Sequence, residues 1–94
     1  MVKEVHAAHI LVTSVGEAQS ILNDLKIGSK SFAKMAEEKS MCPSGKRGGD
    51  LGWFGRGRMV RGFETAAFSL KKGEMSGPVR TEFGWHIIKL LDVR

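Results

Sequence analysis

The glycine-rich run from Cys42 to Phe63 constrains the fold of this chain more than any other part of its sequence. The run places seven glycines among apolar side chains. Glycine at this density lets the backbone turn tightly and approach a ligand closely, at an entropic cost that an ordinary core avoids. Three apolar residues are spaced along it, Leu51, Met59 and Phe63. We therefore expect a small apolar pocket in this part of the chain.

The length of the chain limits how many cores it can form. Its 94 residues predict one domain, residues 1–94, because a chain of this size has no room for two cores. The charged fraction of 27% and the hydrophobic fraction of 41% are those of a soluble globular domain.

Targeting signals and cysteine usage bear on the cellular compartment. No window reaches the ~18 consecutive apolar residues that a membrane span needs, and residues 1–5 lack the apolar stretch of a signal peptide. Cys42 is the only cysteine, so no intrachain disulfide can form. Together these features predict a cytoplasmic protein without a membrane partner, or one domain of a larger chain.

The charge balance is basic. Lys and Arg number 15 against 10 Asp and Glu, for a formal net charge of +5, which favours acidic partners or nucleic acid through long-range attraction. Most basic residues are scattered, however, which favours a solvated rim over a nucleic-acid footprint. Binding to nucleic acid or to ribosomes therefore remains the less favoured alternative. The one basic group lies along the glycine-rich run and comprises Lys46, Arg47, Arg56, Arg58 and Arg61.

The N-terminal half predicts one strand and two helices. Val5–Val12 alternates as a strand, which places His9 on the same face as Val5, Ala7 and Leu11, and His6 on the opposite, solvent-facing side. Ser14–Glu17 is a capping box that opens a helix ending at Gly28. Ser29 to Ser31 can cap a second helix that runs to about Lys39. The residues expected to face the core are Ala18, Ile21, Leu22, Leu25, Phe32, Met35 and Ala36.

The C-terminal half predicts three strands and one helix. A loop with a helical turn over residues 40–50 leads to a strand over 51–54, and a helix over 60–68 buries Val60, Phe63 and Ala67. After a turn at 71–74, residues 75–79 are expected at a sheet edge, because Pro78 has no amide hydrogen for a ladder. The apolar run 85–91 predicts a central strand. The element order β-α-α-β-α-β-β indicates a small α+β domain.

With that element order, the chain resembles the parvulin-type peptidyl-prolyl cis-trans isomerases over essentially its whole length. Each matching segment is weak alone, but their order and spacing are specific. The short length is similar to that of the stand-alone, single-domain parvulins, for which we expect a monomer. The matching segments are residues 8–12 (AHILV), 42–52 (CPSGKRGGDLG), 57–60 (GRMV) with Phe63, 73–79 (GEMSGPV) and 83–89 (FGWHIIK).

The resemblance implies a fold and a set of site residues. The fold is α+β, a four-stranded antiparallel sheet surrounded by helices in the parvulin-like order β-α-β-α-β-β. By position, Leu51, Met59 and Phe63 would hold the proline ring of the substrate, with Phe83 beside them. The residues expected to act on the reacting amide are the paired His9 and His86, with Thr81 near them, and Cys42 at the polar position that faces the amide.

One departure from the family concerns phosphate. The branch that requires phosphorylated Ser or Thr before proline carries a basic cluster in the loop after the first strand. Here that loop is Thr13-Ser14-Val15, without Lys or Arg. We therefore expect no phosphate-directed specificity.

Cys42 has three possible roles. As a nucleophile it would need a base such as His9 or His86, but isomerisation requires no covalent attack, and members of the family place Asp at this position. As a small hydrophobe it would only fill space. We favour a polar role that tunes the electrostatics around the amide.

The histidines also have alternative roles. A lone histidine on an apolar strand is usually a hydrogen-bonded core residue, but two such histidines from two apolar strands favour a network that orients the pocket. Direct acid–base catalysis and plain core packing are the less favoured roles. A zinc site built from His6, His9, His86 and Cys42 lacks any recognised ligand spacing.

These observations predict a peptidyl-prolyl cis-trans isomerase. It would catalyse non-covalent rotation about Xaa-Pro bonds in unfolded or flexible protein segments, without a cofactor or a metal. The rotation breaks no bond, so neither a nucleophile nor a metal is required. Two alternatives stay open: a chaperone module that holds peptides, and a basic protein associated with nucleic acid or ribosomes.

Overall fold

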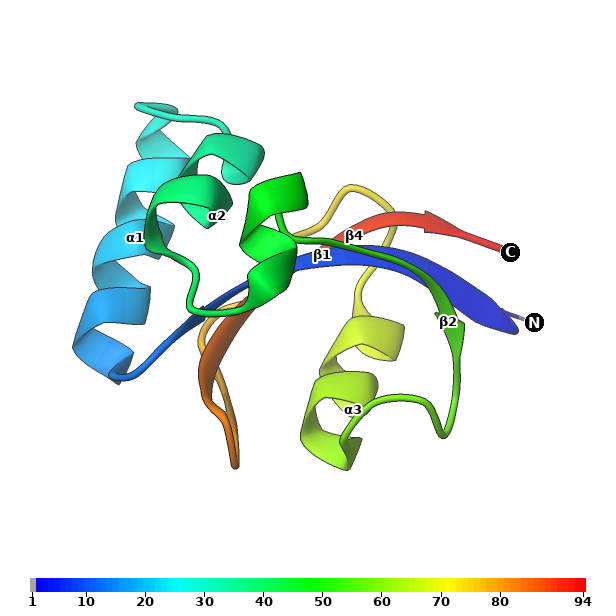
Figure 1. Cartoon of the computed structure of the whole chain (residues 1–94). Helices are drawn as coiled ribbons and strands as arrows, with labels where there is room; N and C mark the ends of the chain where they lie inside the picture. Colours follow the sequence, from blue (N-terminus) through cyan, green and yellow to red (C-terminus); the bar gives the residue numbers. More distant parts are fainter. Residues whose placement is uncertain (1) are drawn as a thin grey trace.

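The computed structural model describes residues 2–94 and forms one four-stranded antiparallel sheet with helices on both faces (Figure 1). The strands lie side by side in the order β2-β1-β4-β3. This confirms the predicted α+β fold, with two helices and a 3₁₀ turn between the first two strands. The elements are β1 (Glu4–Val12), α1 (Val15–Ile27), α2 (Phe32–Lys39), the 3₁₀ helix η1 (Pro43–Arg47), β2 (Asp50–Gly55), α3 (Arg61–Ser69), β3 (Val79–Thr81) and β4 (Gly84–Val93).

Local sequence signals set the ends of α1 and α2. The Ser14 hydroxyl accepts a hydrogen bond from the Glu17 N–H at 3.2 Å, which is the serine half of the predicted capping box. Gly28 ends α1 with a left-handed φ of 75°. The Ser31 hydroxyl caps α2 by accepting from the Lys34 N–H at 3.1 Å. None of the helices within residues 2–94 has the length and apolar character needed to cross a bilayer.

Strand β1 lies inside the sheet, and its two faces pack against different helices. Ala8, Ile10 and Val12 are buried in a cluster with α1 and α2. Val5 and Ala7 are buried in a second cluster with α3. We call the first the closed face and the second the site face of the sheet. Strand β4 contributes to both and pairs with β1 and β3, so the predicted central position of the last strand is confirmed.

Two predicted details of the C-terminal half are wrong. Of the strand predicted over residues 75–79, only Val79 lies in a strand: β3 is Val79–Thr81, and Met75 makes an isolated bridge to Lys89. The ladder is interrupted between Met75 and β3, where the Ile88 N–H donates to the Ser76 hydroxyl at 2.9 Å instead of to a backbone carbonyl. In addition, Val60, which the helical pattern predicts to be buried, is half-buried at the N-cap of α3.

Candidate active site

A close backbone contact positions the glycine-rich run beside β1. The His9 N–H donates to the Gly49 carbonyl at 2.9 Å. Gly49 has a left-handed φ of +82°, and a Cβ at this position would lie 2.3 Å from the His9 carbonyl oxygen. Only glycine satisfies both conditions. Glycine at position 49 therefore allows β2 to approach the strand that carries His9.

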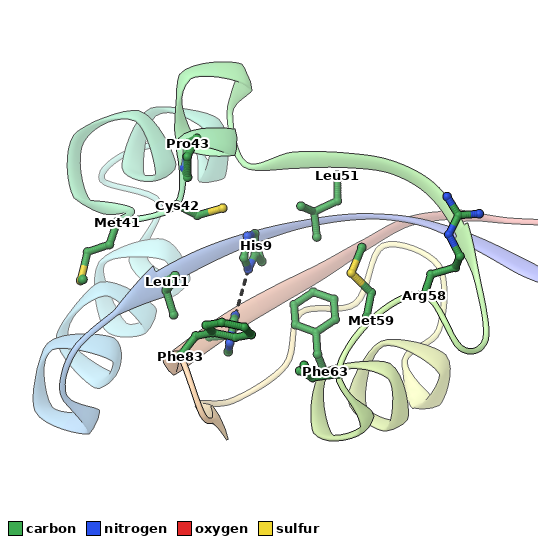
Figure 2. Close-up of a pocket in the computed structure, with 12 residues that line it drawn as sticks. His9, Leu11, Met41, Cys42, Pro43, Leu51, Arg58, Met59, Phe63 and Phe83 are labelled. Atoms are coloured by element: carbon green, nitrogen blue, oxygen red, sulfur yellow. Dashed lines mark hydrogen bonds between the residues drawn. The ribbon is translucent and has the colours of Figure 1, made fainter.

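The site face of the sheet opens into a cavity of about 510 Å³ (Figure 2). Its floor is formed by His9 of β1 and His86 of β4. One wall is formed by Leu51 of β2, Met59 of the following loop and Phe63 of α3, and it lies opposite a second wall (Figure 2). That second wall consists of Leu11, Met41 and Phe83.

The structure gathers the predicted site residues in one place. Thr81 does not line the cavity but contacts His86 behind it. Sequence reasoning did not assign Leu11, Met41, Pro43, Arg58 and Val60 to the site, although all of them line the cavity. For Leu11 a signal was present, since it lies two residues after His9 on the same face of the strand. The predicted residues that line the cavity are His9, Cys42, Leu51, Met59, Phe63, Phe83 and His86.

His9 and His86 form a buried hydrogen-bonded pair. Their Nδ1 atoms lie 2.9 Å apart, and the rings stack with centroids 5.1 Å apart at 17°. Thr81 Oγ1 lies 2.6 Å from His86 Nε2 and accepts from the Phe83 N–H at 3.2 Å. An Nδ1–Nδ1 hydrogen bond requires one nitrogen to carry a proton and the other to accept it. The pair therefore shares one proton between the two facing nitrogens.

Burial keeps both histidines neutral at pH 7. Desolvation, with a smaller contribution from the charge on His86, lowers the pKa of His9 from 6.5 to about 4. Desolvation also lowers the pKa of His86. A second proton on the accepting Nδ1 would break the Nδ1–Nδ1 bond, so the neutral state and the observed geometry agree.

One end of this network has no partner within residues 2–94. His9 is 5% exposed, and its Nε2 is buried without a hydrogen bond in that part of the chain. The Phe63 ring stands edge-on to both imidazoles, with centroids 5.3 Å from His9 and 5.2 Å from His86. Such an unpaired polar atom is costly in a core. His9 itself belongs to the cavity floor, so the site keeps this cost beside the cavity.

Cys42 is held at the cavity edge by two serines. The Ser44 hydroxyl donates to Cys42 Sγ at 3.2 Å, and the Cys42 N–H donates to Ser40 Oγ at 3.3 Å. Ser40 Oγ also accepts from the Leu11 N–H at 3.1 Å, which ties this loop to β1. Cys42 is half-buried, so its sulfur has both a polar neighbour and access to the cavity.

His6 lies outside the cavity. Its Nε2 lies 2.7 Å from Asp50 Oδ1, and its ring lies 5.4 Å from that of Trp53. It is half-buried, where the alternation of β1 predicted a surface residue. The difference arises because His6 pairs with Trp53 of β2, and the Trp53 ring and Asp50 contact the imidazole.

Comparisons with known proteins agree on one family. The model of the PPIC-type PPIase (rotamase) domain matches residues 9–92. The foldase protein PrsA of Geobacillus kaustophilus is 49% identical over 90 residues, covering 95% of this chain and 32% of that protein. The parvulin NmPin of Nitrosopumilus maritimus is similar with a TM-score of 0.86 and 45% identity, covering 96% of this chain and 97% of NmPin. CsPin of Cenarcheaum symbiosum is similar with a TM-score of 0.83 and 50% identity, covering 98% of this chain and 95% of CsPin.

Proposed function

The chain belongs to the family of PPIC-type peptidyl-prolyl cis-trans isomerase domains, the parvulins, and we propose that its substrates are unfolded or flexible protein segments with unphosphorylated Xaa-Pro bonds. Rotation about Xaa-Pro bonds is the activity of this family. The chain spans about a third of the length of the foldase relatives that it matches. What a longer protein containing this domain does with its clients is therefore part of the proposal.

Rotation about the Xaa-Pro amide requires of the site only a suitable shape and polarity. Rotation crosses a barrier of ~18–20 kcal/mol, which arises from amide resonance, and takes tens to hundreds of seconds unaided. To reach milliseconds, the site must lower the barrier by about 5–7 kcal/mol. It does so by binding the twisted amide more tightly than either planar form. An apolar cavity contributes because the planar amide is the more polar state and loses more when water is excluded.

We assign the side chains of the cavity three roles. Leu51, Met59 and Phe63 hold the proline ring by apolar contact. The neutral His9–His86 pair sets the shape and hydrogen-bonding pattern of the floor, with Thr81 fixing the orientation of His86. Cys42 presents a polarisable sulfur to the rotating amide. It forms no covalent bond with the substrate, because isomerisation needs no covalent step. Phe83, in the turn between β3 and β4, lies across the cavity from the side chains that hold the ring (Figure 2).

The single observation that carries this proposal is the apolar cavity above a neutral, buried histidine pair. A nucleic-acid site would need cations lining it, whereas all but one of the residues that line this cavity are uncharged. The loop after β1 carries no Lys or Arg, which supports the absence of a phosphate requirement. A cytoplasmic location, for which the lone cysteine speaks, and a monomeric state are predictions.

Exchange NMR on proline peptides tests this function. The protein is added to Ser-Pro and phosphoserine-Pro peptides of otherwise identical sequence, and the cis–trans exchange rate is measured in the presence of a chelator. We expect catalysed exchange of both peptides, within a few-fold of each other. Tight binding without faster exchange would instead identify a peptide-holding chaperone. A hundredfold preference for the phosphopeptide would refute the substrate class proposed here.

A further inference from the structure

The two ends of the cavity differ in chemical character. At one end the loop between β2 and α3 supplies Arg58, the one charged side chain among the residues that line the cavity. At the other end the lining is apolar and consists of Leu11, Met41 and Phe83. Figure 2 shows these three side chains across the cavity from Arg58 and Met59. We call the two regions the cationic end and the apolar end.

The sheet register separates these ends along β1. The loop of Arg58 leaves β2 at Gly55, which pairs with Glu4 at the start of β1. Leu11 lies near the end of the same strand, where its carbonyl accepts from the Met41 N–H at 2.8 Å. An extended strand advances about 3.3 Å per residue. An extended substrate lying along β1 would therefore place different residues over the two ends.

Arg58 has no carboxylate partner within residues 2–94, in contrast to its neighbour Arg56. Arg56 lies 3.6 Å from Glu64 and stacks 4.3 Å above the Phe68 ring. Those contacts on α3 occupy the Arg56 guanidinium, and it does not line the cavity. The two arginines are two residues apart, yet only Arg58 lines the cavity and has no carboxylate partner within residues 2–94.

The apolar end is formed by side chains that the fold leaves exposed. Met41 is 58% exposed and Phe83 is 61% exposed, although both are large and apolar. Their backbones are anchored, Met41 to Leu11 and Phe83 to the Thr81 hydroxyl at 3.2 Å. Anchored backbone with exposed apolar side chains at a cavity mouth is suited to covering an apolar group of a ligand.

We propose that the cavity reads both neighbours of the proline, and selects substrates with a carboxylate on one side of it and an apolar side chain on the other. Arg58 binds the carboxylate, and Leu11, Met41 and Phe83 cover the apolar side chain. The selection rests on the proposed isomerase function and adds a substrate class to it. It requires no phosphate, because a single arginine pairs with the single charge of Glu or Asp.

The test compares four peptides that differ only next to the proline: Glu-Pro-Leu, Gln-Pro-Leu, Leu-Pro-Glu and Leu-Pro-Gln. Exchange NMR gives kcat/KM for each. In one of the two orders we expect Glu to be preferred over Gln by about three- to fivefold, the range of a partly exposed ion pair. The other order would place the carboxylate over the apolar end, so its Glu-to-Gln ratio should be one or less.

Two arginine variants of equal charge separate Arg58 from the general field of the protein. Arg58→Gln should reduce the Glu-to-Gln ratio to about one, whereas Arg56→Gln should keep the wild-type ratio. Each comparison is made within one variant, so a change in folding or in overall rate cancels. For the apolar end, replacing Leu by Ser in the preferred peptide should lower kcat/KM about threefold or more in the wild type, and less in Met41→Ser.

The possible results distinguish a failure of the isomerase function from a failure of the two-ended substrate selection. If no peptide exchanges faster, the isomerase function itself is wrong. If all exchange but Glu is preferred equally in both orders, or equally in the two arginine variants, the preference comes from net charge and the two-ended selection is refuted. A preference confined to one order and lost only in Arg58→Gln supports it.

Discussion

The two faces of the sheet are built from the same strands but differ in what they leave unsatisfied. The closed face consists of apolar side chains from β1, β4, α1 and α2 and contains no buried titratable group. The site face contains Phe54, Phe63 and Ile88, but also two buried histidines and a cavity of about 510 Å³. One face is filled, and the other keeps a hollow and an unpaired nitrogen at His9.

This difference indicates that the two faces of the sheet have different roles in this small domain. Filling a core stabilises it, while a cavity and desolvated polar groups cost stability. A domain of this size is only marginally stable. We infer that the closed face supplies the stability that lets the site face remain open and polar.

Truncating a side chain on the closed face should lower stability without affecting catalysis. Ile21 of α1 is 3% exposed, so Ile21→Ala should cost about 2–5 kcal/mol of unfolding free energy. Urea unfolding measures the cost, and kcat/KM per folded molecule should stay the same. Ile27 on the same helix is 77% exposed, so the control Ile27→Ala should change stability by no more than about 0.5 kcal/mol. A loss of activity in folded Ile21→Ala would show that the faces are coupled.

Acid should destabilise the protein through the site face. The pKa of His9 is lowered to about 4 in the folded protein, from 6.5 in the unfolded chain. The unfolded chain therefore binds more protons between these values, so stability is complete above pH 6.5 and is lost as the pH falls towards 4. The loss should be on the order of 3 kcal/mol.

Urea unfolding at several values between pH 7 and pH 4.5 measures this loss. His9→Gln should flatten the pH dependence, whereas Ile21→Ala should shift the whole curve downward without changing its slope. A flat wild-type curve would mean that the folded site accepts the proton, and would remove the electrostatic contrast between the faces.

Two methionines allow a matched test of catalysis. Met59 lines the cavity, whereas Met75 packs against the closed-face cluster, and both are half-buried. Met59→Ala should lower kcat/KM at least tenfold, because the lost apolar contact to the proline ring is worth ~1.5–3 kcal/mol. Met75→Ala should leave kcat/KM unchanged. Equal activity of both variants, with the fold intact, would place the proline elsewhere.

The smallest effect is expected at Cys42. Cys42→Asp should retain substantial activity, and Cys42→Ala should lose only part of it, about two- to fivefold for one hydrogen-bonding polar group. Peptide exchange measures both, with mass spectrometry to detect any adduct. Complete inactivity of both variants together with a trapped thioester would establish covalent chemistry at the site face.

Much of the fold could be predicted because its signals are local. Ser14 and Gly28 set the ends of α1 through contacts within a few residues, and the alternation of β1 assigned its two faces correctly beyond His6. The start of the edge strand β3 at Val79, instead of at Met75, could not be predicted from local patterns. It depends on the Ser76 hydroxyl meeting the Ile88 N–H, a contact across 12 positions that no local pattern encodes.

Local patterns along the chain specify the helix ends and the strand alternation, and the family resemblance identifies the residues of the site. The tertiary structure alone decided how these residues interact. His9 and His86 are 77 positions apart, and only the pairing of β1 with β4 brings their Nδ1 atoms together and lowers their pKa values. Arg56 and Arg58 are the same residue type in one short loop, yet α3 offers Glu64 and Phe68 to the first and leaves the second at the cavity. The reason is physical: caps and periodicity act between near neighbours, whereas burial, pKa and charge pairing depend on what the folded chain places alongside.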